Sequence, residues 1–399
     1  MVTTDFLVIG GGVIGVNIAR ELRARHPSAK VIVLEKESSA GQHASGRNSG
    51  VLHAGFYYTP DSLKAKFTRI GNQVLHEYCE QKKLRVNKCG KLVVARDQSQ
   101  LEFLDELLRR ASANGVPLQS ITEQEAREIE PRVKTFQRAL FSPTTSSVDP
   151  AEVMAAMVAD AKTEGVDVRV GEAYSGKDGD RVRTTRDIYE ARYIVNAAGL
   201  YADQVARDFG FSEHYRILPF KGLYLYSDEP VGAVRTHIYP VPDLRNPFLG
   251  VHYTLTVDGK IKIGPTAIPA FWREQYTGFD RFSASEFAEI IARQAGLFMF
   301  SNFDFKTLAI NELRKYSKTR MAEEAGELLH GVSDSQFSKW GKPGIRAQLL
   351  DLRKKKLEMD FVLEGDGKSM HVLNAVSPAF TGSIPFSRYV CDKIAEQLK

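Results

Sequence analysis

The sequence predicts a mixed α/β protein, in which an α+β domain with an antiparallel sheet is inserted into a βαβ domain. Within the first 35 residues, a strand, a glycine-rich turn, a helix and a second strand follow one another, which is the order of a parallel α/β sheet. Similar apolar strands return in the middle and near the end of the chain. Residues 216–258 instead alternate in polarity and carry aromatic residues and prolines, as antiparallel strands do.

The first βαβ unit is predicted by a change in apolar spacing. Phe6–Ile9 is a short apolar run and Val31–Leu34 is a β-branched run, so both read as buried strands. Between them, Val13–Arg25 repeats apolar residues every three to four positions, as a helix does. The elements that follow in the first half are a helix over Asp61–Gln81, a strand over Gly90–Ala95, and helices over Gln98–Asn114 and Thr122–Ile129.

The second half begins with a return of the parallel pattern. A helix over Pro150–Glu164 has Asp149 as its expected N-cap and a proline in its first turn. The other expected elements are strands over Val166–Val170, Tyr193–Ala197 and Met370–Asn374, and helices over Ser283–Arg293, Phe305–Ala325 and Phe386–Leu398. We therefore predict a discontinuous nucleotide-binding domain over residues 1–85, 145–215 and 340–399, and a substrate or cap domain over 86–144 and 216–339.

Composition excludes several classes of protein. The 399 residues are 43% hydrophobic and carry a net charge of +5, which is too weak a charge to indicate nucleic-acid binding. The three cysteines form no CxxC pair, so we expect neither a disulfide framework nor a metal site. No apolar run reaches the roughly 18 residues of a membrane span, and a strand at Phe6 leaves no room for a signal peptide. These features predict a cytoplasmic protein.

One segment, Leu349–Met359 (LLDLRKKKLEM), is basic and partly amphipathic. Its spacing predicts a solvated surface helix. The alternative is a peripheral contact with an anionic surface such as the inner membrane.

The glycine-rich turn has the spacing of a Rossmann-like dinucleotide site. Gly10, Gly12 and Gly15 form G-x-G-x-x-G between a strand and a helix, and Glu35 closes the second strand. The glycines allow a tight turn, close approach of the backbone to a pyrophosphate, and close packing of helix on strand. Glu35 is placed to accept hydrogen bonds from ribose hydroxyls, which disfavours a 2′-phosphate and therefore NADP.

Two features favour FAD over NAD. YIVNAAGLYAD supplies a second strand end made of small residues, and Ser45–Gly50 supplies a polar, small-residue segment that a permanently held isoalloxazine needs close to its ring. The middle of the chain has no second G-x-G-x-x-G for a nicotinamide cofactor. Electrons are therefore expected to come from an organic substrate and to leave to oxygen, a quinone or another flavoprotein.

Several segments together carry a resemblance that covers nearly the whole chain: GGGVIG, ASGRNSGVLHAGFYY, GKLVVA, YIVNAAG, PFKG, FLGVHYT, PGIRAQ and NAVSPAFTGS. They resemble the D-amino-acid-oxidase-type FAD-dependent oxidoreductases, and within these the L-2-hydroxyglutarate dehydrogenase/oxidase family. The resemblance implies oxidation of L-2-hydroxyglutarate, or a related 2-hydroxy acid, to the 2-oxo acid. The implied FAD-binding residues are Gly10, Gly12, Val13, Ile14, Gly15, Glu35, Lys36, Ser45, Arg47, Asn48, Ser49, Gly50, Val51, Ala198, Gly199, Ser377, Pro378, Phe380, Thr381, Gly382 and Ser383.

The expected reaction moves a hydride from the substrate to flavin N5 while the hydroxyl loses its proton, so it needs a base and cations for carboxylates. His252 is our first candidate for the base. His53 is the rival, and it could instead touch or be covalently linked to the flavin. For carboxylates we expect Arg346 first, because a guanidinium grips a carboxylate through two hydrogen bonds, and then Lys221. Tyr57 is expected to donate a hydrogen bond to the substrate.

Two other functions stay open at this point. One is an amine or amino-acid oxidase of the same fold, of the glycine or sarcosine type, whose rate would rise with pH through the pKa of the substrate amine. The other is a non-catalytic protein that holds flavin as a scaffold and is never reduced by small acids, alcohols or amines.

Overall fold

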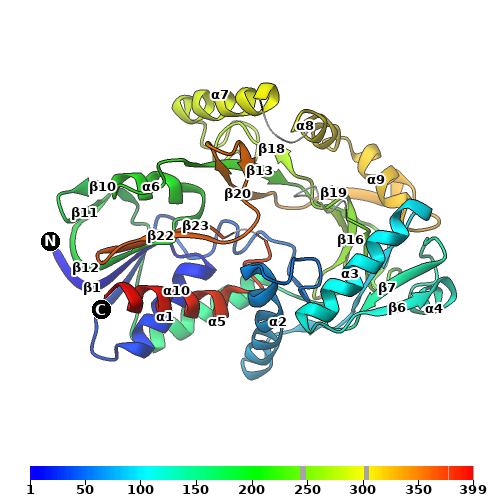
Figure 1. Cartoon of the computed structure of the whole chain (residues 1–399), viewed down its shortest axis with the longest axis horizontal. Helices are drawn as coiled ribbons and strands as arrows, with labels where there is room; N and C mark the ends of the chain where they lie inside the picture. The colour runs from blue at the N-terminus through cyan, green and yellow to red at the C-terminus, as the bar shows by residue number, and fades with distance from the viewer. Residues whose placement is uncertain (243–248, 301–304, 376, 399) are drawn as a thin grey trace. The chain divides into compact units, whose positions relative to one another are not determined.

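The computed structural model describes residues 1–399 with the exception of 243–248, 301–304, 376 and 399. The chain divides into two compact units (Figure 1). Unit 1 consists of Met1–Asn48, Pro150–Pro219 and Arg346–Lys399, and unit 2 consists of Ser49–Asp149 and Phe220–Ile345. Residues 49–85 group with unit 2. Two of the four boundaries between the units fall within strands, β13 (Tyr215–Gly222) and β20 (Gly344–Asp351), and the other two lie at 48/49 and 149/150.

The centre of unit 1 is a parallel sheet. Its strands run in the order β9 (Asp167–Val170), β2 (Val31–Glu35), β1 (Val2–Ile9) and β12 (Ile188–Asn196), and β23 (Ser369–Asn374) pairs with the end of β12. The apolar side chains of β1 and β2 are buried, which explains why these strands read as continuous hydrophobic runs. Antiparallel strands extend the sheet: β10 (Tyr174–Asp178), β11 (Arg181–Thr184) and β22 (Val362–Gly365).

Three helices of unit 1 lie side by side along one face of this sheet (Figure 1). They are α1 (Val13–Arg25), α5 (Pro150–Thr163) and α10 (Ser383–Gln397), with α1 packed against both of the others. The Ser387 hydroxyl on α10 donates to the carbonyl of Ile14 on α1 at 3.3 Å. The first and last helices of the chain therefore share one layer. A short helix, α6 (Ala202–Asp208), follows β12.

Unit 2 contains an eight-stranded sheet. In order, its strands are β19 (Phe337–Trp340), β14 (Leu225–Ser227), β17 (Ile261–Gly264), β16 (His252–Leu255), β15 (His237–Pro240), β5 (Lys91–Val94), β7 (Arg138–Ser142) and β6 (Gln119–Thr122). Neighbours are antiparallel except for β15 and β5, which are parallel. The predicted fold class, with an antiparallel sheet outside the parallel one, is confirmed.

Two smaller groups of strands complete the unit. A three-stranded sheet joins β3 (Val51–Leu52), β8 (Ser146–Val148) and β4 (Val86–Asn87). β13 pairs through Lys221 with β18 (Ile268–Pro269).

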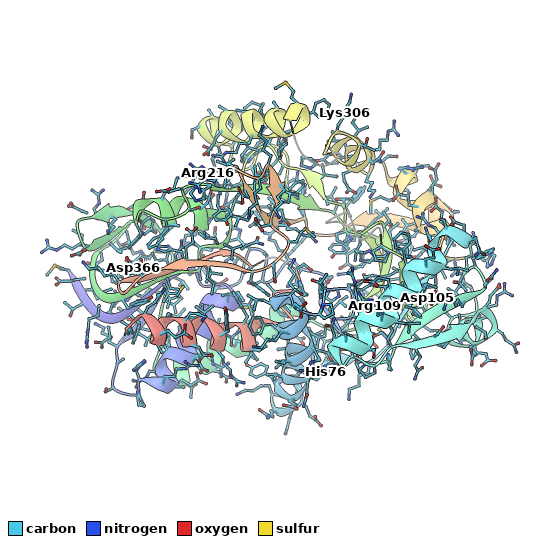
Figure 2. All side chains as sticks on the ribbon, viewed as in Figure 1. His76, Asp105, Arg109, Arg216, Lys306 and Asp366 are labelled. Carbon is cyan, nitrogen blue, oxygen red and sulfur yellow. The ribbon has the colours of Figure 1, made fainter. Side chains whose placement is uncertain are left out.

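Several helices of unit 2 bury an apolar face or begin at a side-chain N-cap. They are α2 (Leu63–Gln81), α3 (Leu101–Asn114), α4 (Glu123–Ile129), α7 (Ala284–Phe300), α8 (Phe305–Arg314) and α9 (Lys318–Gly326). On α3, Leu104 and Leu107 are fully buried, whereas Asp105 and Arg109, labelled in Figure 2, are exposed. His76 on α2 (Figure 2) shares a 2.6 Å hydrogen bond with the Ser146 hydroxyl of β8.

The prediction of a surface helix over Leu349–Met359 was wrong. Leu349–Asp351 ends β20, and a turn then leads into β21 (Lys356–Leu357), which pairs with β20 as a hairpin. The leucines at 349, 350 and 357 are buried in this hairpin, and Lys355 at the turn has a φ of 51°. The basic residues all lie in the exposed turn. Their spacing in the sequence is the same as that of residues on the polar face of a helix, which is why a helix was predicted.

Two other predicted helices have different bounds in the structure, because a serine caps each helix at a position that the prediction missed. The helix expected over Phe305–Ala325 is two helices, because Ser317 caps a new one by accepting a hydrogen bond from the Arg320 N–H. Similarly, α2 begins two residues later than expected, with Ser62 as its N-cap. The short strands β7, β10, β11 and β22 were not expected.

Candidate functional site: an FAD cradle and a buried lysine cluster

Three strand ends of unit 1 meet at the first glycine of the motif. The Gly10 N–H donates to the Leu34 carbonyl of β2 at 2.8 Å, and the Ala197 N–H that follows β12 donates to the Ile9 carbonyl at 2.9 Å. Gly10 has a φ of 113°, and a Cβ there would lie 2.4 Å from the Ala197 carbonyl oxygen. Only glycine fits this crossing of chains.

The start of α1 is open to a ligand. Its N-cap is Gly12, which has no side chain, and the Val13 N–H donates to the Ser45 hydroxyl at 2.9 Å. A Cβ on Gly12 would meet only that hydroxyl, at 3.1 Å. Backbone N–H groups and the positive end of the helix dipole favour an anion at such a terminus.

Glu35 is fixed at the end of β2. Its carboxylate accepts hydrogen bonds from the Gly11 N–H at 3.1 Å and the Glu37 N–H at 2.9 Å. Burial raises the pKa of Glu35, and the two backbone donors oppose that rise. The carboxylate therefore lies beside the glycine turn, where it can accept from the hydroxyls of a nucleotide ribose.

Two further features of unit 1 fit a bound cofactor. Gly199, just after β12, has a φ of 57°, and a Cβ there would meet no atom within 4 Å. The Ser383 hydroxyl at the start of α10 is buried and has no hydrogen-bond partner in the described part of the chain. Buried hydroxyls are normally paired, so this hydroxyl fits a site whose partner is a ligand atom.

The other predicted cofactor residues divide between the units. In unit 1, Arg47 Nε donates to the Gln42 carbonyl at 2.7 Å, the Asn48 amide donates to the Ser45 carbonyl at 2.8 Å, and Lys36 pairs with Glu37 at 2.9 Å. Those held within unit 1 are Gly10, Gly12, Val13, Ile14, Gly15, Glu35, Lys36, Ser45, Arg47, Asn48, Ala198, Gly199, Ser377, Pro378, Phe380, Thr381, Gly382 and Ser383. Ser49, Gly50 and Val51 belong to unit 2.

Unit 2 holds a cluster of aromatic rings around a buried lysine, here called the Lys91 cluster: Lys91, Phe56, Tyr57, Tyr239 and His252. Lys91 Nζ lies 4.7 Å from the Phe56 ring centroid, 4.6 Å from that of Tyr57 and 4.7 Å from that of Tyr239. The His252 ring packs on Tyr239 with centroids 3.8 Å apart. The cluster therefore brings together two predicted catalytic residues, Tyr57 and His252.

The two histidines in and beside this cluster are held neutral. Burial lowers the pKa of His252 to about 3, and the positive charge of Lys91 contributes in the same direction. His252 Nδ1 lies 2.8 Å from the Gly250 carbonyl, so Nδ1 carries the proton and Nε2 has the lone pair. Burial also lowers the pKa of His237 to about 3, and its Nδ1 accepts from the Leu255 N–H at 3.1 Å.

His53, the rival candidate for the base, follows β3 in unit 2 and is partly exposed. Its backbone is fixed by Asn72 of α2, whose amide donates to the carbonyls of Leu52, His53 and Thr144 at 3.1–3.2 Å.

The two predicted carboxylate-binding cations lie in different units. Lys221 is on β13 in unit 2, is 5% exposed, and points its ammonium over the Tyr316 ring at 5.9 Å. Burial lowers its pKa. Arg346 is on β20, is partly buried, and belongs to unit 1.

The sequence reasoning missed two buried lysines, Lys91 and Lys262. Lys262 Nζ donates to the Ser49 carbonyl at 3.0 Å and lies over the Tyr224 ring at 4.3 Å. Both lysines stand inside short apolar strands, KLVV and IKIG. A charged residue in a strand that otherwise reads as fully buried was the available signal.

A glycine turn after the first strand, an acid at the end of the second strand and an open helix terminus are together typical of a dinucleotide-binding oxidoreductase. Residues 5–326 match the family model described as DAO, FAD dependent oxidoreductase. The chain belongs to this family. FAD is therefore the cofactor of this protein.

Relatives of similar length share a third of the sequence. The mitochondrial L-2-hydroxyglutarate dehydrogenase of Nematostella vectensis is 36% identical over 98% of this chain and 91% of that protein. The L-2-hydroxyglutarate dehydrogenase of Escherichia coli (strain K12) is 35% identical over 98% of this chain and 93% of that protein.

Solved structures share the fold. L-α-glycerophosphate oxidase from Mycoplasma pneumoniae with FAD bound is similar with a TM-score of 0.78 and 22% identity, over 99% of this chain and 95% of that one. Glycine oxidase from Geobacillus kaustophilus follows with a TM-score of 0.70 and 19% identity, over 99% and 95%. Among the residues that the structure describes, no helix has the length and apolarity needed to cross a membrane.

Proposed function

We propose that this protein oxidises L-2-hydroxyglutarate to 2-oxoglutarate with bound FAD. The proposal depends chiefly on one observation: proteins named for this activity are 35–36% identical to nearly the whole chain. The cradle in unit 1 supplies the binding site for the dinucleotide part of FAD. When bound there, FAD would supply the acceptor for the hydride that leaves C2 of the substrate.

The residues of the chain must then take the hydroxyl proton and hold the carboxylates. We propose His53 as the base. A general base works best when it can reach the substrate and when its pKa is near the working pH. His53 is partly exposed, and Asn72 fixes the backbone that carries it.

His252, our first candidate from the sequence, is less suited to that task. Burial holds its pKa near 3. A base this weak has little driving force for removing an alcohol proton. His252 remains the alternative base, with Nε2 as the accepting atom.

For the carboxylate next to the hydroxyl we propose Arg346, since a guanidinium donates two parallel hydrogen bonds to one carboxylate. Lys221 is the second candidate, and Tyr57 is a candidate hydrogen-bond donor.

An anaerobic titration of the FAD-loaded protein tests the function. We expect L-2-hydroxyglutarate to bleach the flavin absorption near 450 nm and D-2-hydroxyglutarate to leave it oxidised. Bleaching by glycine or sarcosine, with a rate that rises through the pKa of the amine, would instead indicate an amine oxidase. A yellow protein that none of these compounds reduces would indicate a flavin scaffold.

Substitutions of the two histidines identify the base. We expect His53→Asn to slow anaerobic flavin reduction by about 100-fold or more, which is the usual contribution of a general base. FAD content and thermal stability should be unchanged. If His53→Asn reduces its flavin at the wild-type rate and His252→Asn does not, His252 is the base.

The electron acceptor and the location are separate proposals. We propose oxygen or a quinone as acceptor and a cytoplasmic location, with the exposed basic turn at 353–356 as the point of any peripheral membrane contact. Sedimentation with anionic vesicles, compared with neutral vesicles, tests the contact. Activity with each acceptor tests the other proposal.

A further inference from the structure

Lys91 is a buried cation for which the described part of the chain offers no hydrogen-bond acceptor. Its side chain is 0% exposed, and Nζ has no hydrogen-bond partner. Three aromatic rings surround the ammonium at 4.6–4.7 Å. Ring faces attract a cation, but they do not replace an anion, and an unpaired buried charge is costly.

No acidic side chain of the described residues compensates Lys91. Burial alone lowers its pKa, to about 7, and no carboxylate acts in the other direction. Two other lysines act on the same cluster through their charge, and both are satisfied: Lys315 is paired with Glu312 at 2.5 Å, and Lys262 donates to a backbone carbonyl. Lys91 therefore stands apart from the other two in having no partner.

A second unsatisfied polar group lies beside it. The Tyr57 hydroxyl is buried and has no hydrogen-bond partner in the described structure. Tyr57 has the largest exposed fraction in the cluster, 9%, against 4% for His252 and 0% for Lys91. A cation and a hydroxyl that both lack an acceptor, in a cluster without acids, together form a site that is complementary to a carboxylate.

We propose that the Lys91 cluster binds the second carboxylate of a dicarboxylate substrate and so selects 2-hydroxyglutarate over shorter, monocarboxylic 2-hydroxy acids. The Lys91 ammonium provides the charge, and the buried Tyr57 hydroxyl donates a hydrogen bond to the same carboxylate. Tyr239 and His252, which pack on each other, form the wall that keeps the ammonium in place. This inference rests on the proposed function, because it presumes a substrate with two carboxylates.

The three surrounding rings also explain how Lys91 can stay buried when no ligand is bound. An amine with a pKa near neutrality can give up its proton and lie among aromatic rings as a neutral group. A carboxylate that binds in the cluster restores the charged form, because the ion pair stabilises the ammonium. Binding of a dicarboxylate is therefore expected to take up a proton.

The experiment compares ligands that differ in one carboxylate, with the FAD-loaded protein throughout. The anaerobic flavin reduction rate is measured with L-2-hydroxyglutarate and with L-2-hydroxybutyrate. Binding is measured with glutarate and butyrate by the change in the flavin spectrum. The variants are Lys91→Met, which keeps the length of the side chain, Tyr57→Phe, and Lys88→Met, which removes an exposed charge from the same segment.

We expect Lys91→Met to lower the preference for the dicarboxylate by about 100-fold, and Tyr57→Phe by about 10-fold, in rate and in binding, as for lost hydrogen bonds to a charged group. Lys88→Met should keep the wild-type preference. Proton uptake on glutarate binding, from calorimetry in buffers of different ionisation enthalpy, should disappear in Lys91→Met. FAD content and melting temperature verify that each variant is folded.

The outcomes separate the two proposals. If Lys91→Met is folded and loses rate equally on both hydroxy acids, or keeps the wild-type preference, the role of Lys91 is refuted and the proposed function stands. If the wild type binds glutarate in a Lys91-dependent way but is not reduced by L-2-hydroxyglutarate, the function is refuted and the carboxylate site stands. If the wild type binds neither ligand and is not reduced, both are refuted.

Discussion

The glycines of the cradle allow cofactor binding to be separated from folding by a single methyl group. Gly12→Ala and Gly15→Ala are the matched pair. A Cβ on Gly12 would approach only the Ser45 hydroxyl, at 3.1 Å, and Gly12 already has an ordinary negative φ of −76°. A Cβ on Gly15 would lie 2.0 Å from the Gly10 carbonyl oxygen.

The expected magnitudes follow from those contacts. In Gly12→Ala the serine side chain needs to move by only a few tenths of an ångström, so the cost to folding is at most the loss of its bond to the Val13 N–H, about 1 kcal/mol. The new methyl group occupies the space through which a pyrophosphate approaches α1, so we expect FAD affinity to fall by about 100-fold. In Gly15→Ala two backbone segments must separate by more than 1 Å, so we expect a cost to folding of about 3 kcal/mol or more.

Two assays on the same preparations test this pair. Quenching of FAD fluorescence by the apoprotein gives affinity, and urea unfolding of the apoprotein gives stability. Gly12→Ala should lose affinity with nearly normal stability, whereas Gly15→Ala should lose about 3 kcal/mol or more of the free energy of unfolding. If Gly12→Ala binds FAD as tightly as the wild type, the pyrophosphate does not approach the helix at Gly12, and this account of the cradle is refuted.

Three further outcomes are expected. The contribution of three buried histidines to stability should be complete above pH 6.5 and should be lost as the pH drops toward 4. The reason is that the unfolded chain then binds protons at His237, His252 and His371, whereas burial keeps their folded pKa values at about 3, 3 and 4. The free energy of unfolding should change by up to about 1.4 kcal/mol per pH unit for each histidine. Urea unfolding at pH 7.5 and at pH 5.0 measures this change, and an equal urea midpoint at the two pH values would contradict the expectation. Ser62→Ala should destabilise α2 by about 1 kcal/mol through loss of its N-cap while leaving FAD affinity unchanged, and equal urea midpoints would contradict it. Asn72→Leu should cost about 2 kcal/mol and slow flavin reduction, because the carbonyls around β3 lose their donor; a variant as fast and as stable as the wild type would show that Asn72 does not position this segment.

Residue spacing and turn residues predicted those parts of the fold whose contacts join residues close together in the chain. The first βαβ unit, the glycine turn and Glu35 lie within 35 consecutive residues, and their spacing alone specifies the cradle. The long helices were also predictable, because their apolar residues repeat at helical spacing, as in α1 and α3. The hairpin at 349–357 was not, since its buried leucines and basic turn are spaced as they would be in an amphipathic helix.

The Lys91 cluster could not be predicted because it is assembled from distant segments. Lys91 is brought beside Tyr239 by the parallel pairing of β5 with β15, across about 150 residues of sequence. His252 is then placed on Tyr239 by the antiparallel pairing of β15 with β16. Pairing of distant strands sets these contacts, and no local periodicity encodes it.

Unit 1 is built from three separate stretches of the chain, and this affects how it folds during synthesis on the ribosome. β1, α1 and β2 are synthesised early, but the strand that pairs with the end of β12 is β23 (Ser369–Asn374) and the helix that packs on α1 is α10 (Ser383–Gln397). A nascent chain therefore holds an incomplete flavin domain until these two elements have been made. Its apolar helix face stays uncovered until the final segment emerges, so chaperones have their longest opportunity to act on the part that was made earliest.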